Sequence, residues 1–119
     1  MKIAIIVYEE TMMRCTGGGC LNAFFQRLDS FARYAGRDDL ELVAFTHNGG
    51  DIDKKIGVLM KKGVGAVHLS SCIRKKDPNY ELLAKRLSEH FSVVGYTHGE
   101  ENGGIGQTII LAKQQQTVS

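Results

Sequence analysis

The strongest constraint on the fold is that strand-like apolar runs alternate with helix-like amphipathic segments along most of the chain. Residues 2–8 form a nearly continuous run rich in Ile and Val, which is typical of a parallel strand buried on both faces. Further strands are predicted over residues 40–46, 64–70 and 92–97. Successive strands lie roughly 30 residues apart, the length of a strand–helix–strand unit. We therefore expect right-handed crossovers that build a parallel sheet with helices on its faces.

Three helices are predicted between these strands. The first begins after Gly17, Gly18 and Gly19 and ends near Gly36, the second covers residues 51–62, and the third runs from residue 78 or 79 to residue 91. Each is marked by apolar residues at spacings of three and four: Leu21, Phe24, Phe25, Leu28 and Phe31; Ile52, Ile56 and Leu59; Leu82, Leu83, Leu87 and Phe91. In the third helix these residues are expected to face inward. Asp51 is expected to cap the second helix and Gly63 to end it.

These elements indicate a single-domain three-layer α/β sandwich with a four- to five-stranded, mostly parallel sheet, flavodoxin-like or Rossmann-like in strand order. A chain of 119 residues has room for one core, because it buries roughly two-thirds of its unfolded surface. We expect the α/β domain to cover residues 1–98. Residues 99–119 then form a C-terminal extension, in which the apolar residues 109–112 are expected to form a short helix, with an edge strand as the alternative, before a polar tail.

Charge and hydropathy argue against nucleic-acid and membrane partners. The net charge is +2, and the basic residues cluster only in short runs such as residues 74–76, which is too little to follow a phosphate backbone. The longest apolar stretches fall far short of the about 20 residues that a membrane helix needs. The first residues lack the length and the cleavage site of a signal peptide. We therefore expect a cytoplasmic location.

The residues best suited to chemistry fall at the ends of predicted strands. They are Cys15 and Cys20 after the first strand, His47 at the end of the second, His68 and Cys72 at the end of the third, and His98 at the end of the fourth. The carboxyl ends of parallel strands meet at one edge of a sheet, where ligands bind in open α/β folds. An odd number of cysteines does not suit a disulfide framework, and unpaired thiols are typically buried, metal-bound or reactive.

The loop from Cys15 to Cys20 is open to three interpretations. In the first, both thiolates bind one metal ion, and the glycines let the backbone fold tightly around it. In the second, the segment Thr16 to Gly19 binds a phosphate or a carboxylate at the start of the following helix. In the third, the helix dipole favours the Cys20 thiolate, and Cys15 or Cys72 resolves it in thiol-redox or persulfide chemistry. The plainer alternative is that Cys20 packs as a small hydrophobic residue.

Two histidines and Cys72 also depend on their surroundings. His68 is either a ligand or a hydrogen-bonded core histidine. His98, which precedes Glu100 and Glu101, is either a ligand supported by carboxylates or an exposed residue. Cys72, in the loop after the third strand, comes within reach of the first loop if the first and third strands are neighbours, since adjacent strands lie about 4.8 Å apart.

The interpretation we prefer is a metal-binding protein. Its ligands come from two sets, the thiolates of Cys15, Cys20 and Cys72 and an imidazole from His47, His68 or His98. Zinc is the first choice of metal, and iron, alone or in a cluster, is the second. Thiol-redox or persulfide chemistry and the binding of a small anion without metal are the alternatives, together with a scaffold that forms homo-oligomers.

Four segments resemble the small CGGC-domain proteins. They are Arg14-Cys15-Thr16-Gly17-Gly18-Gly19-Cys20-Leu21, Ala23-Phe24-Phe25, Val67-His68-Leu69-Ser70-Ser71-Cys72-Ile73 and Thr97-His98, so the resemblance covers the chain from its start to about His98. CGGC-domain proteins are regarded as metal binders because of their many cysteines and histidines. The resemblance therefore implies an α/β domain with a metal site, with zinc as the expected ion, and it implies no defined reaction.

The chain departs from the family pattern at two places. The Cys-Gly-Gly-Cys element that names the family should follow the second strand, where this chain has His47-Asn48-Gly49-Gly50. His47 can still bind a metal, whereas Gly50 cannot. A later cysteine of the family, before the third helix, is replaced near Asp77-Pro78. A site of the family type would therefore have fewer ligands in this chain.

Overall fold

The computed structural model describes residues 1–101 and 108–114, which form a five-stranded sheet in the order β2-β1-β3-β4-β5. The strands are β1 (Lys2–Val7), β2 (Glu41–His47), β3 (Val64–Leu69), β4 (Ser92–Val94) and β5 (Ile110–Leu111). β1 pairs in parallel with β2 and β3, β3 pairs in parallel with β4, and β5 is antiparallel to β4. The mostly parallel α/β sandwich is thus confirmed, and its strand order is the flavodoxin-like one.

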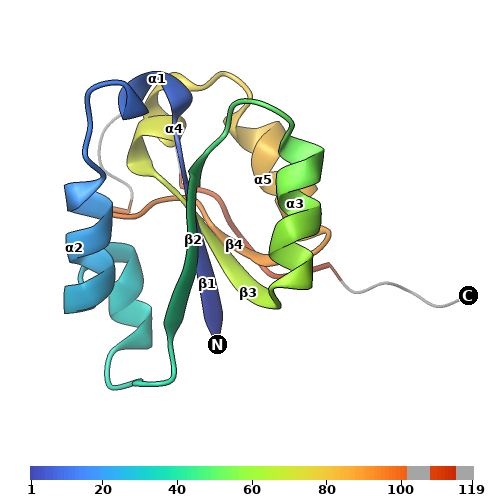
Figure 1. Ribbon diagram of the computed structural model, residues 1–119. Helices are drawn as coiled ribbons and strands as arrows, with labels where there is room; N and C mark the ends of the chain where they lie inside the picture. The colour runs from blue at the N-terminus through green and yellow to red at the C-terminus, as the bar shows by residue number, and fades with distance from the viewer. Residues whose placement is uncertain (102–107, 115–119) are drawn as a thin grey trace, which may run out of the picture.

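Helices cover both faces of the sheet (Figure 1). α2 (Gly18–Gln26) and the 3₁₀ helix η1 (Asp29–Tyr34) lie against one face, and α3 (Ile52–Lys61) and α5 (Tyr80–Ser88) lie against the other. Two shorter helices, α1 (Glu9–Met12) and α4 (Ser71–Lys76), lie beyond the carboxyl ends of β1 and β3. In the described part of the chain, no helix is long and apolar enough to cross a membrane.

β1 forms the centre of the hydrophobic core. Its residues from Ile3 to Val7 are at most 3% exposed, because helices cover both faces of the strand while β2 and β3 flank both of its edges. Alternate side chains enter different halves of the core. Ile6 packs with residues of α3 and α5, and Ile5 packs with residues of α2 and η1. This is the burial on both faces that the continuous apolar run predicted.

The prediction of one continuous helix after the glycines is wrong, because the helix is divided in two. α2 ends at Gln26, and Arg27 and Asp29 then adopt left-handed backbone conformations, with φ of 55° and 53°. This break interrupts the helical spacing of the apolar residues. Phe31, after the break, is fully buried, whereas Phe25, within α2, is 65% exposed.

The second predicted helix is confirmed at both ends. The Asp51 carboxylate caps α3 by accepting a hydrogen bond from Lys54 N at 3.1 Å. After the last turn, Gly63 takes a left-handed conformation with φ of 77°, as expected of a residue that ends a helix.

The C-terminal third of the chain differs from the prediction at several places. α5 ends at Ser88 and β4 at Val94, earlier than the predicted ends at residues 91 and 97. α5 begins at Tyr80 and buries Leu87, but it leaves Leu82 68% exposed, so the expectation that Leu82 faces inward is wrong. The helix expected at residues 109–112 is instead the edge strand β5, because the pairing with β4 satisfies its backbone. The sequence pattern contained both alternatives for this segment.

The burial of α5 predicts different effects for two identical substitutions. Replacing Leu87 by Ala should lower the free energy of unfolding by about 2–5 kcal/mol, because it opens a cavity in the core. Leu82→Ala, in the same helix, should cost less than about 0.5 kcal/mol. Urea denaturation of both variants measures the difference. Equal losses would mean that α5 packs through another face.

Candidate functional site

A cavity of about 310 Å³ at the carboxyl edge of the sheet brings together most of the reactive residues. Its walls come from the end of β1, from α1, from the start of α2 and from α4. The reactive and charged side chains that line it are Cys15, Cys20, Cys72, His98, Lys75 and Lys76. All three cysteines and one of the four histidines of the chain therefore share one cavity.

Cys15 and Cys20 lie at opposite ends of one loop and have different surroundings. Cys15 is exposed, between α1 and α2, and its Sγ accepts a hydrogen bond from Gly17 N at 3.3 Å. Cys20 lies in the first turn of α2 and is buried, with its Sγ 3.1 Å from Thr97 Oγ1. Cys20 thus contacts the core from within α2, whereas Cys15 is exposed to solvent.

Cys72 enters the cavity from the neighbouring strand. The sequence put it in a loop, but it is the second residue of α4, half-buried, and its Sγ lies 2.7 Å from Ser70 Oγ. β3 lies directly beside β1, which is the condition that the sequence set for Cys72 to approach the first loop. The missed helix therefore changes the local geometry of Cys72 and leaves its expected neighbours unchanged.

Burial raises the pKa of the Cys20 thiol above its ordinary value. The hydrogen bond with Thr97 acts in the opposite direction, and negative charge on Cys72 or Cys15 raises this pKa further. The redox alternative needs a Cys20 thiolate that the helix dipole stabilises, so the direction of the shift argues against Cys20 as the nucleophile.

His98 reaches the cavity because Gly19 leaves room for its ring. A Cβ atom at Gly19 would lie 3.1 Å from His98 Nε2, which is tighter than an ordinary contact. α4 holds the backbone of the same residue, since Ser71 Oγ donates to His98 O at 2.6 Å. Gly99 N donates to the Asp29 carboxylate at 3.0 Å and fixes the chain on the other side. His98 is therefore exposed, with its backbone held on both sides and its ring lining the cavity beside Gly19.

His68 is a core residue, which contradicts its prediction as a ligand. Its Nδ1 lies 2.9 Å from Ser30 Oγ, and its Nε2 lies 2.9 Å from Tyr34 OH. Ser30 Oγ donates its own proton to Thr97 O at 3.0 Å, so it accepts from His68 Nδ1–H. Tyr34 OH then donates to Nε2. A neutral imidazole has no further position to offer, so His68 has no nitrogen left for a metal.

The same burial keeps His68 neutral. It is fully buried, its ring stacks on Phe31 with 4.2 Å between the centroids, and desolvation lowers its pKa from the ordinary 6.5 to about 3. The Tyr96 carbonyl, 3.4 Å from Nδ1, acts in the opposite direction, and the charge of Arg33 lowers the pKa further. His68 thus supports the fold as an uncharged hydrogen-bonding group.

His47 also lies outside the cavity. It ends β2, and its Nδ1 accepts a hydrogen bond from Gly49 N at 3.0 Å within its own turn. β2 is the edge strand, so β1 separates it from the strand that leads to Cys72. His47 therefore belongs to a different part of the carboxyl edge, and the cavity contains one imidazole among the described residues.

The glycine loop is only partly available to an anion. Gly17 and Gly19 line the cavity, but Gly18 N already donates to Thr16 Oγ1 at 3.2 Å. Gly17 has φ of 79°, and a Cβ atom there would lie 2.6 Å from Phe45 Cζ, so the position requires glycine for both reasons. The packing of the loop therefore accounts for glycine at position 17 without any bound ligand.

Sequence reasoning missed two features of the site. Lys75 and Lys76 line the cavity one turn after Cys72, because residues 71–76 are helical and bring them to the same face. The basic run was visible in the sequence, but its position depends on α4. Among the described residues no carboxylate side chain lines the cavity, and the charged side chains that do so are basic.

The donors of the cavity fit a soft metal ion in kind, but they are not arranged around a common point. In the ranges 1–101 and 108–114, no three His, Cys, Asp or Glu side chains form a group that could hold a metal. Each thiol is directed instead to its own hydrogen-bond partner. Ligation therefore requires rotation of these side chains.

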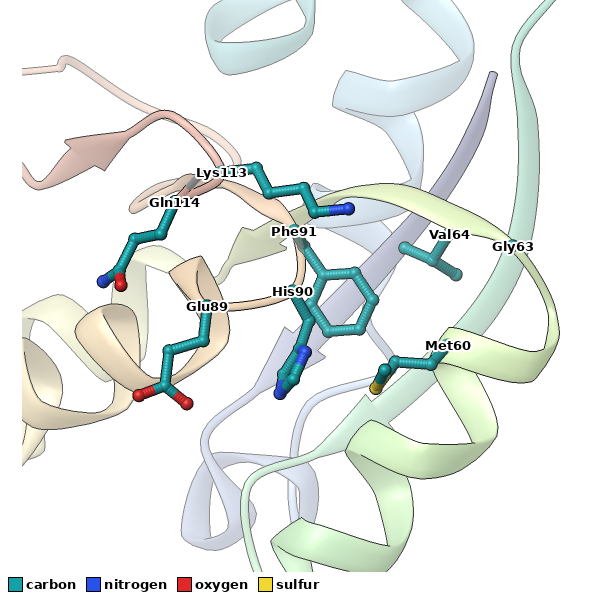
Figure 2. Close-up of a pocket in the computed structure, with 8 residues that line it drawn as sticks. All are labelled: Met60, Gly63, Val64, Glu89, His90, Phe91, Lys113 and Gln114. Atoms are coloured by element: carbon teal, nitrogen blue, oxygen red, sulfur yellow. The ribbon is translucent and has the colours of Figure 1, made fainter. Parts of the chain in front are cut away.

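A larger cavity of about 770 Å³ lies at the opposite edge of the sheet (Figure 2). It is formed where β3 begins at Val64 and where the chain enters β4 after Phe91. Figure 2 shows Glu89 and Met60 on opposite sides of the Phe91 and His90 rings. The lining includes His90 but no cysteine, so the thiols are confined to the carboxyl edge.

Fold and site together define a class, a flavodoxin-like α/β domain with a cysteine-lined cavity at the carboxyl edge of its sheet. Residues 2–98 match the family model of the CGGC domain, and the chain belongs to that family. Membership supports metal binding as the broad class of function without identifying the metal or its ligands. No curated protein and no solved structure matches the chain.

The buried His68 predicts a loss of stability in acid. Its pKa is lower in the folded chain than in the unfolded chain, so between about pH 6.5 and 3 the unfolded state binds one more proton, and the free energy of unfolding falls as the pH falls. This residue should contribute a slope of at most about 1.4 kcal/mol per pH unit. Urea denaturation at several pH values, with NMR of the His68 ring, measures it. A ring that becomes charged near pH 6.5 in the folded protein would contradict the prediction.

Proposed function

We propose that the protein binds a thiophilic metal ion, zinc by preference, in the cavity at the carboxyl edge of the sheet. The observation that carries this proposal is that Cys15, Cys20, Cys72 and His98 line one cavity. Three thiolates and an imidazole are one of the usual tetrahedral donor sets for zinc, and iron is the second choice because it also accepts thiolates. His68 is left out because both of its nitrogens are bonded, and His47 because it lies elsewhere.

The energies involved favour rotation of the thiols toward an ion. Each thiol would give up a hydrogen bond of about 0.5–1.5 kcal/mol or less, since sulfur is a weak partner. A structural zinc site in a small domain gains about 10–16 kcal/mol in return. Cys15 lies on the exposed side of the cavity and is the ligand with most freedom to move. The loss of the present contacts is therefore small compared with the gain.

Four protein ligands fill a tetrahedral site. Such a site leaves no open position at which a substrate or a water molecule could react, unlike a catalytic zinc site with three protein ligands. Lys75 and Lys76 stand beside the cavity and would balance the negative charge of three thiolates. The proposal is therefore one of metal binding, and it assigns no reaction to the protein.

Removing one ligand should weaken zinc binding strongly. His98→Gln and Cys72→Ser should each lower the affinity by at least about tenfold, because each removes a direct donor. Competition with a chromophoric chelator measures the affinity, and elemental analysis gives the stoichiometry. His90→Gln is the matched control, because His90 lies at the opposite edge of the sheet and should leave the affinity unchanged.

Two results would count against the metal site. One is a wild-type protein that retains less than about 0.2 equivalents of zinc or iron after reconstitution under reducing conditions. The other is equal affinity in the His98→Gln and His90→Gln variants, which would mean that the metal is bound outside the cavity.

A second candidate function is the binding of a small anion without metal. The observation that favours it is the basic lining of the cavity, which the start of α2 shares with Lys75 and Lys76 and which includes no carboxylate from residues 1–101 or 108–114. Backbone N–H groups and the dipole of a helix attract anions at this position. Phosphate and carboxylate are the expected ligand groups. In this case the thiols would keep their present hydrogen bonds.

An anion site predicts a dependence on the two lysines. In metal-free protein, inorganic phosphate should shift the amide signals of Gly19 and Cys20, and replacing Lys75 and Lys76 by Gln should weaken this binding several-fold because it removes the charge. Lys54→Gln, on the exposed surface of α3, is the control. NMR titration measures the affinity. Phosphate binding that is equal in all variants would eliminate this candidate.

A further inference from the structure

Asn48 joins the two short helices, α1 and α4, that both line the cavity. Its Oδ1 accepts a hydrogen bond from Glu9 N at 2.9 Å, and its Nδ2 donates to Asp77 Oδ2 at 2.8 Å. Glu9 is the first residue of α1, and Asp77 is the C-cap of α4. One half-buried side chain outside the cavity therefore contacts both helices.

Each of these helices leads directly to a thiol. Cys15 N donates to Thr11 O at 2.8 Å, so Cys15 is bonded to the last turn of α1. Asp77 N donates to Ile73 O at 2.9 Å, which keeps Asp77 continuous with the helix that carries Cys72. α1 and α4 are only about 6 and 9 Å long at about 1.5 Å per residue. A shift at either contact of Asn48 is thus transmitted to a thiol over one or two helical turns.

The turn that carries Asn48 is itself fixed to the centre of the sheet. Asn48 N donates to Val7 O at 2.9 Å, at the end of the buried strand β1. Lys55 Nζ donates to the carbonyl oxygens of His47 and Gly49, at 2.6 and 2.8 Å, and closes the turn from the side of α3. The contacts of Asn48 therefore connect both helices to the end of the buried strand β1.

The two contacts require the amide of asparagine. Glu9 N is a donor and needs an acceptor, whereas the Asp77 carboxylate needs a donor, and a carboxamide offers one of each at the same distance from the backbone. α1 has no side-chain cap of its own, so Asn48 supplies its cap from another part of the chain. An aspartate would keep the contact with Glu9 N but would turn a second carboxylate toward Asp77.

We propose that Asn48 is a positioning residue that sets the separation of the Cys15 and Cys72 thiols and, through it, the affinity of the cavity for its metal. The second half of this statement rests on the proposed metal-binding function, and the first half does not. The hydrogen bond between Asn48 and Asp77 joins the two segments at which the chain departs from the family pattern described above, the position of the Cys-Gly-Gly-Cys element and that of the later cysteine. In this chain those segments shape the cavity without supplying a thiol.

The test uses the bifunctional thiol reagent dibromobimane on the full reduced chain, with the Cys15–Cys72 cross-link quantified by mass spectrometry. Asn48→Asp should reduce the yield of this cross-link several-fold, and should lower zinc affinity by about tenfold. The exchanged pair Asn48→Asp with Asp77→Asn restores a carboxylate facing an amide, so both quantities should return toward wild type. Asn22→Asp makes the same change of charge on the exposed side of α2 and should alter neither.

A cross-link yield in Asn48→Asp equal to that of Asn22→Asp, or one that the exchanged pair does not recover, would overturn the positioning role. If Asn48→Asp does not fold, Asp77→Ala removes the same hydrogen bond without facing two carboxylates, and the same loss of cross-link is expected. Because cross-linking needs no metal, a protein that binds no zinc but shows the predicted yields would refute the proposed function and retain the positioning role of Asn48.

Discussion

The complete burial of β1 is the constraint on which the rest of the structure depends. Helices cover both faces of this strand and parallel neighbours occupy both of its edges. The loop that follows β1 therefore lies beyond the carboxyl end of the strand. β3 is parallel to β1 and ends at the same edge of the sheet. The loop that carries Cys15 and the helix that carries Cys72 therefore meet there, and the cavity is a consequence of the packing of the sheet.

A buried network of polar side chains contacts one cysteine of this cavity. Ser30 connects the η1 segment to His68 on β3 and to the carbonyl of Thr97 after β4. The hydroxyl of Thr97 in turn contacts the Cys20 thiol. The position of one cysteine of the site is thus linked to the hydrogen bonds of the core, and every member of the network has a partner, which is what makes buried polar groups tolerable in a hydrophobic interior.

Local patterns predicted most of the fold because the apolar run of a buried strand and the cap of α3 can each be recognised from residues close in sequence. The continuous apolar run of β1 and the cap at Asp51 are examples. The patterns failed where the outcome depends on distant partners. The break after α2 involves left-handed conformations at Arg27 and Asp29, which no local signal marks, and β5 is a strand only because β4 offers an open edge. Leu82 and Leu83 are both apolar, and packing alone leaves Leu82 exposed.

The sequence by itself determined the alternation of strands and helices, the edge of the sheet at which the cysteines gather, and the family that the chain resembles. The tertiary structure decided which residues share the cavity. His68 and His98 both follow strands, yet one points into the core, where Ser30 and Tyr34 take both of its nitrogens, and the other reaches the cavity over Gly19. The role of a histidine is set by which groups surround its ring, and those groups come from segments far apart in the chain.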